Sequence, residues 1–108
     1  MILNVIIDSK QTEIDVPQHV LDEGHDFFDM MDRDMDQGWK IGPEFVENPD
    51  QEMRIQIAAD KILSAIARQK TNTLNMMAGY ILNRDPSVRL IQIDTSGEPL
   101  NTKIVRTD

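Results

Sequence analysis

The chain has 108 residues, a net charge of −8 and no cysteine. Its length predicts a single domain over residues 1–108. The lack of cysteine excludes disulfides, thiolate metal sites and thiol nucleophiles, and it is typical of a cytoplasmic protein. We see no leader-like segment and no apolar stretch long enough to span a bilayer, so the sequence predicts no membrane partner.

The charge is unevenly distributed along the chain. Residues 1–60 contain 15 acidic and 4 basic side chains, whereas residues 61–108 contain 4 acidic and 7 basic ones. An acidic surface repels nucleic acids and favours basic partners. The basic residues of the second half are interleaved with apolar ones, which is typical of helix surfaces. We therefore expect no nucleic-acid partner.

The first elements are predicted to form a β-hairpin. Residues 2–7 are mostly large or β-branched, and residues 12–16 alternate between apolar and polar. The polar segment 8–11 separates the two runs, as in an antiparallel hairpin with one buried face. Because a lone hairpin is marginal in water, we expect a helix or a third strand to cover it.

Three helices are predicted after the hairpin, at about 17–39, 49–70 and 73–83. The first shows apolar residues at helical spacing, and the second opens on Asn48 as a cap and Pro49 at its first turn. The segment 41–48 reads as a connector with a short helical turn. The stripe of the first helix consists of Val20, Gly24, Phe27, Phe28, Met31, Met35 and Trp39.

The chain is predicted to close with a strand at about 88–94. Strands at both ends with helices between them indicate an α+β fold in which the terminal strands share one sheet. The alternative is a mainly helical domain with loosely attached ends. Residues 103–105 read either as a short return strand or as a loose tail.

The third predicted helix is apolar on nearly all sides. A short helix without a polar face is normally buried all round. In a small chain this burial can come from a second subunit, so the sequence predicts a homo-oligomer with its interface at Leu74, Met77, Tyr80 and Ile81. The alternative is that this helix is the central core helix of a monomer.

The first helix is also predicted to carry an acidic face. Five aspartates follow one another by three or four residues and so lie on one side: Asp22, Asp26, Asp29, Asp32 and Asp36. This face could bind a basic protein partner. The alternative is a solvated surface, supported by the acid-before-base pairs Asp29–Arg33 and Asp36–Lys40 at i,i+4 spacing.

Two cation sites can be read on the same helix. Asp22, His25 and Asp29 form a carboxylate–imidazole–carboxylate row that could hold Mn²⁺, Fe²⁺ or Zn²⁺. Downstream, Asp32, Asp34 and Asp36 have the spacing of the first ligands of a calcium loop, and in this the segment resembles the EF-hand family. The resemblance covers about 13 residues, and it breaks where Gln37 stands at the glycine position and Pro43 at the final glutamate position.

The sequence favours a non-enzymatic role. It contains two histidines, no nucleophile elbow and no glycine-rich phosphate loop. Catalytic pairing is a matter of space that spacing cannot settle, so enzymatic activity stays open. We expect an acidic accessory protein that acts as a homo-oligomer and presents its acidic face to a basic partner. A divalent-cation-binding protein is the alternative.

Overall fold

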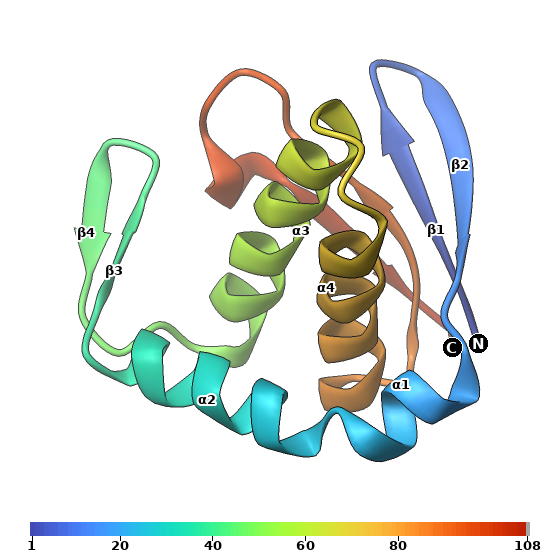
Figure 1. Cartoon of the computed structure of the whole chain (residues 1–108). Coiled ribbons are helices and arrows are strands. Elements are labelled where there is room, and N and C mark those ends of the chain that lie inside the picture. Colours follow the sequence, from blue (N-terminus) through green and yellow to red (C-terminus); the bar gives the residue numbers. More distant parts are fainter. Residues whose placement is uncertain (108) are drawn as a thin grey trace.

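A four-stranded sheet forms one layer of the protein, and the helices cover one of its faces (Figure 1). The computed structural model describes residues 1–107. The strands are β1 (Ile2–Ile7), β2 (Lys10–Asp15), β5 (Val88–Gln92) and β6 (Lys103–Arg106), in the order β2-β1-β5-β6. β1 runs antiparallel to β2 and parallel to β5, and β5 runs antiparallel to β6. The predicted α+β fold with terminal strands in one sheet is confirmed.

The first hairpin has a tighter turn than predicted. Only Asp8 and Ser9 connect its strands, with φ of 51° and 67°. A two-residue hairpin turn of type I′ requires positive φ at both positions, because its twist then matches that of the strands. β2 therefore begins at Lys10, and all six residues of β1 are paired with all six of β2.

Two long helices, α3 (Gln51–Ala67) and α4 (Thr71–Arg84), pack side by side on the sheet. α3 begins two residues later than predicted, because Asp50 is the cap in place of Asn48: its carboxylate accepts a 2.8 Å hydrogen bond from the Met53 amide. The core lies between the two layers. Its fully buried side chains include Leu3, Val5, Ile91, Ile55, Ile62, Tyr80 and Ile81.

The first predicted helix is divided into α1 (Gln18–Glu23) and α2 (His25–Asp36), which cross the end of α4 (Figure 1). The division lies at Gly24. A Cβ there would stand 2.6 Å from the Val20 carbonyl oxygen and 2.7 Å from Cζ of Phe28. The missing side chain therefore makes room for the Phe28 ring, which is buried and packs edge-on against Tyr80 at 6.0 Å.

A second hairpin occupies the region predicted as the end of the first helix and a connector. β3 (Trp39–Ile41) and β4 (Glu44–Val46) form a separate two-stranded sheet that projects from the body (Figure 1). α2 ends at Asp36, and Gly38 and Gly42 adopt φ of 100° and 61°. These left-handed conformations favour glycine and turn the chain into the hairpin. The predicted helical turn in 41–48 is therefore wrong.

The last strand is held by a buried side chain of α3. Nε2 of Gln56 donates to the carbonyl oxygens of Leu100 and Thr102 at 3.1 and 3.0 Å. Leu100 belongs to a short 3-10 helix, η1 (Pro99–Asn101), that leads into β6. Residues 103–106 are thus a return strand and not a loose tail. Within residues 1–107, none of the helices has the length and apolar character that crossing a membrane requires.

Candidate functional site

The centre of the predicted acidic face points into the protein. Asp32 on α2 lies against α3 and α4, with its side chain 27% exposed. Its Oδ1 accepts hydrogen bonds from the Tyr80 hydroxyl at 2.5 Å and from Nη1 of Arg54 at 3.3 Å. Its Oδ2 accepts from Nε of Arg84 at 3.0 Å. One carboxylate therefore joins three helices.

Two further aspartates of this face share the same arginines. Nη2 of Arg84 lies 2.8 Å from Asp29, and Nη2 of Arg54 lies 2.7 Å from Asp36. The pairs with Arg33 and Lys40 expected from the sequence are not among the ion pairs of residues 1–107. We call the resulting group the Asp32 cluster: Asp29, Asp32, Asp36, Arg54, Tyr80 and Arg84.

The arginines of the Asp32 cluster are well covered. The side chains of Arg54 and Arg84 are 11% and 19% exposed. Arg54 also donates to the backbone carbonyls of Pro49 at 2.8 Å and Asp32 at 3.2 Å, and to the Asn48 side chain at 3.0 Å. It therefore fixes the segment between β4 and α3 against α2. Charge-assisted bonds of this kind are among the stronger ones in proteins.

The cluster shifts the ionisation of its members. Burial acts to raise the pKa of Asp32, but the hydrogen bonds from Tyr80, Arg54 and Arg84 outweigh it and hold that pKa below its ordinary value. Burial, followed by the hydrogen bond to Asp32, raises the pKa of Tyr80 well above its ordinary range. Asp32 is therefore ionised and Tyr80 is neutral at neutral pH. Because each carboxylate of the cluster is paired with an arginine of α3 or α4, the cluster acts as a structural clamp.

The other end of the predicted acidic face remains at the surface. Asp22 and Asp26 are exposed, together with Glu23 between them. Asp22 accepts a 3.0 Å hydrogen bond from Nε2 of Gln18. None of the ion pairs found among residues 1–107 involves these three acids. We call Asp22, Glu23 and Asp26 the acidic junction, since they flank the break between α1 and α2.

The geometry does not support the predicted cation sites. Within residues 1–107 the structure places no group of three His, Asp or Glu side chains so that they could hold a metal ion. The break at Gly24 puts Asp22 on a different helix from His25 and Asp29, and Asp29 is bound to Arg84. Asp32, Asp34 and Asp36 lie within α2, so the calcium-loop conformation suggested by the EF-hand resemblance is not formed.

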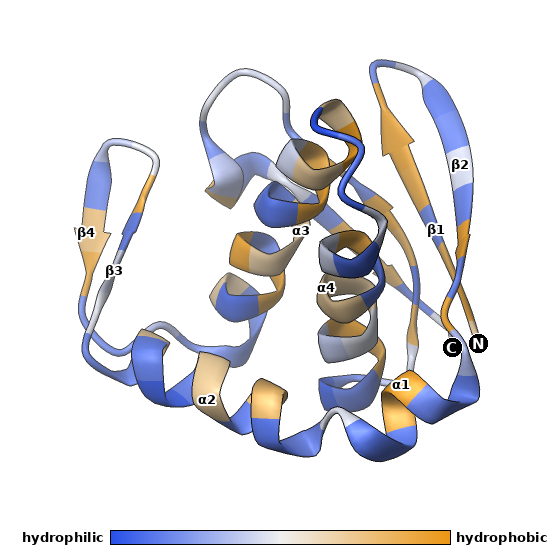
Figure 2. Cartoon of the chain, viewed as in Figure 1, coloured by the Kyte–Doolittle hydropathy of each residue, from blue (hydrophilic) through white to orange (hydrophobic). Residues whose placement is uncertain are grey.

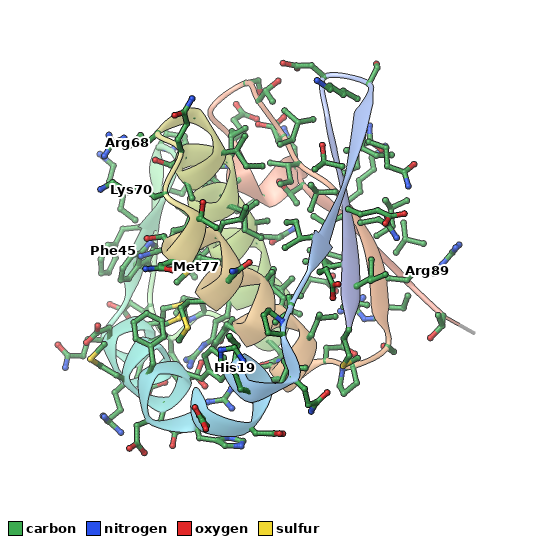
Figure 3. All side chains as sticks on the ribbon, turned by 45° about the vertical axis from the view of Figure 1, so that its right-hand side comes forward. His19, Phe45, Arg68, Lys70, Met77 and Arg89 are labelled. Carbon is green, nitrogen blue, oxygen red and sulfur yellow. The ribbon has the colours of Figure 1, made fainter. Side chains whose placement is uncertain are left out.

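Most of the predicted oligomer interface lies inside the chain. Met77, Tyr80 and Ile81 are 4%, 0% and 0% exposed, and Leu74 is half-buried. Figure 3 shows Met77 among the helices, while Arg89 extends from the far side of the sheet. The burial of α4 is thus provided by the sheet, by α3 and by α1, and it needs no second subunit. Oligomerisation remains a prediction that needs another surface.

A large hollow of the described surface lies elsewhere. A groove of about 760 Å³ separates β2 from the end of α3 and the start of α4. Its apolar lining is provided by Ile7, Ile14, Ala65, Ile66 and Leu74. The sequence did not predict it, because it depends on how the first hairpin leans away from the helices.

Comparison with known proteins adds no further constraint. No model of a protein family, no curated protein and no solved structure matches this chain.

Proposed function

We propose that the protein is a non-enzymatic binding protein that uses the acidic junction to bind a basic partner. The observation that carries the proposal is the contrast in charge compensation along α1 and α2. Asp29, Asp32 and Asp36 are paired with arginines, whereas Asp22 and Asp26 stay exposed without a basic group in pairing distance within residues 1–107. Uncompensated surface charge steers and orients an oppositely charged partner.

The surface around the acidic junction also includes an exposed apolar side chain. Met30 is 44% exposed and follows Asp26 by four residues, so both lie on one side of α2. Figure 2 shows hydrophilic and hydrophobic residues alternating along α1 and α2 at the base of the molecule. Methionine adapts readily to different contacts. The mixed surface suits a basic segment that also carries apolar residues, such as an amphipathic helix with lysine on one face.

We also propose a location and an assembly for the protein. The absence of cysteine favours the cytoplasm, because proteins there rarely use disulfides for stability. Each carboxylate oxygen of Asp32, the partly buried acid of α2, accepts hydrogen bonds from side chains of this chain, which supports a role without catalysis. We propose that the protein forms a homo-oligomer through a surface other than the acidic junction.

Calorimetric titration tests the binding surface. The titrant is a helical peptide with lysine on one face and leucine on the other, compared with the same peptide carrying glutamate in place of lysine. We expect binding of the lysine peptide only, and we expect the double variant Asp22→Asn/Asp26→Asn to weaken it about fivefold or more, because two charges at contact contribute about 1 kcal/mol or more.

The matched control is the double variant Glu44→Gln/Glu47→Gln, which removes the same charge at exposed positions on and after β4. It should change the affinity by less than twofold. An equal loss in both double variants would mean that only the net charge matters. No heat with the lysine peptide, or equal binding of the glutamate peptide, would refute the proposed surface.

A further inference from the structure

The outer edge of β2 exposes backbone groups that no strand of the described chain pairs. The sheet order places β2 at one edge. Met1 and Val16 form a hydrogen-bonded pair, with N···O distances of 3.1 and 2.8 Å. Because such pairs alternate in an antiparallel ladder, Ile14, Thr12 and Lys10 bond to β1. The N–H and C=O groups of residues 11, 13 and 15 therefore point to the free edge.

The two edges of the sheet differ in how well they are protected. β6, at the opposite edge, has four residues, and its pairing with β5 is irregular between Val88 and Leu90. β2 has six residues in unbroken register, with no proline and no bulge. Short and irregular edge strands resist pairing with another chain, whereas long regular ones favour it. The edge of β2 is therefore the better template for an additional strand.

The groove lies directly behind this edge. Lys10 and Thr12 of β2 are exposed, although their neighbours in β1 belong to the buried side of the sheet. Ile66, on the opposite wall of the groove, is 36% exposed. An added strand would thus meet open backbone groups on one side and apolar surface beneath it. This combination is what strand addition uses for affinity.

We propose that β2 pairs antiparallel with β2 of a second copy of this chain, about a two-fold axis at Thr12. In this register Gln11 lies opposite the partner's Glu13, and Thr12 lies opposite the partner's Thr12. The Gln11–Glu13 pair and its symmetry mate each exchange two backbone hydrogen bonds. The two sheets become one sheet, with the helices of both copies on the same face.

The charges of β2 disfavour registers in which the axis lies nearer the end of the strand. Moving the axis to Glu13 would set two glutamates directly opposite each other, and moving it to Ile14 would set Glu13 opposite the partner's Asp15. Like charges in direct cross-strand pairs are destabilising. With the axis at Thr12 the glutamate faces an amide instead, and the aliphatic stem of Lys10 lies opposite the partner's Ile14.

Two-fold symmetry favours a second copy of this chain as the partner that pairs with the free edge of β2. A two-fold pairing uses the same edge of both chains once, so the assembly closes as a dimer. Both copies carry a net charge of −8, so their general repulsion decreases as salt screens it. The dimer should therefore strengthen with added salt, whereas binding of a basic peptide at the acidic junction should weaken. The two proposals can fail independently.

Single-cysteine variants test the register, because the natural chain has no cysteine. Non-hydrogen-bonded antiparallel pairs have Cα atoms about 4.5 Å apart, within the range that disulfides span. Thr12→Cys should thus form a disulfide-linked dimer in air. Lys103→Cys, on the β6 edge, is the matched control. It should stay largely monomeric in non-reducing gel electrophoresis. Equal cross-linking of the two variants would overturn the proposal.

Light scattering gives the second readout. The wild-type protein should have the mass of two chains, and Glu13→Pro should have the mass of one. Proline at residue 13 removes an N–H that points to the free edge, so the bonds to β1 remain. Glu13→Gln keeps the N–H and should remain a dimer. A wild-type mass of one chain at all concentrations, or a mass that grows without limit, would refute the closed dimer. If Glu13→Pro fails to fold by circular dichroism, the cysteine pair decides.

Discussion

Residues 22–26 and residues 29–36 look alike as sequence, since both are runs of acids at helical spacing, but they face opposite environments. The second run lies against α3 and α4, where Arg54 and Arg84 neutralise it. The first run flanks the break at Gly24, with Asp22 and Glu23 at the end of α1 and Asp26 at the start of α2, and its acids are exposed to solvent. A row of carboxylates is thus a clamp or a binding surface according to what its neighbours in space provide.

The largest effect is expected from Asp32→Asn. The amide keeps the size of the side chain but removes the charge that two partly buried arginines share. Arg54 and Arg84 keep their pairs with Asp36 and Asp29, but they lose the charged acceptor that they share, and hydrogen bonds to charged groups contribute about 2–3 kcal/mol. Urea denaturation should show this loss in the free energy of unfolding. A change below about 0.5 kcal/mol would show that the Asp32 cluster is no clamp, since that is the range of ordinary surface substitutions.

An acid titration should give the next largest effect. The pKa of Asp32 is lower in the folded protein than in the unfolded chain, so its contribution is complete above the unfolded value. That contribution is lost as the pH falls through the folded value. Stability should therefore decline from about pH 5 towards pH 2. Because asparagine does not titrate in this pH range, the Asp32→Asn variant should lose less stability than the wild-type protein as the pH falls. Parallel stability curves for the two proteins would contradict this assignment.

The smallest effect is expected at the acidic junction. Asp22→Asn/Asp26→Asn removes exposed charges without an internal partner in the described chain, so the free energy of unfolding should change by less than about 0.5 kcal/mol. The same denaturation experiment measures it. A loss comparable with that of Asp32→Asn would mean that both acidic runs stabilise the fold, and the contrast between them would disappear.

The fold class was predictable from the sequence because hydrophobic periodicity is a local property. The β-branched run in 2–7, the alternation in 12–16 and the apolar segment 73–83 each predict one element from neighbouring residues alone. Boundaries were less predictable. Gly24 was counted as part of an apolar stripe, although its real role is to let the Phe28 ring approach. The first helix was predicted to continue to about residue 39, whereas α2 ends at Asp36, and the hairpin of β3 and β4 was missed.

The Asp32 cluster was missed because its pairs join residues far apart in the chain. The sequence suggested i,i+4 partners for Asp29 and Asp36, and the actual partners are Arg84 and Arg54. One local signal existed. Arg84 follows Tyr80 by four residues and Arg54 precedes the buried Ala58 by four, so both arginines lie beside core positions on their helices. A basic residue on a buried stripe indicates an acidic partner on a neighbouring element.

The centre of the sheet is the parallel pair of β1 and β5, so it can form only after two distant parts of the chain have come together. Val5 pairs with Ile91, whereas the hairpin of β1 and β2 and the helices between are built from local contacts. Closing so long a loop costs entropy that is recovered only when the sheet forms, so this step should limit the folding rate. During synthesis the hairpin of β1 and β2 is made before β5, so both of its edges remain unpaired until β5 is added. The chain is therefore most prone to aggregation after β1 and β2 have been synthesised and before β5 is available to pair with β1.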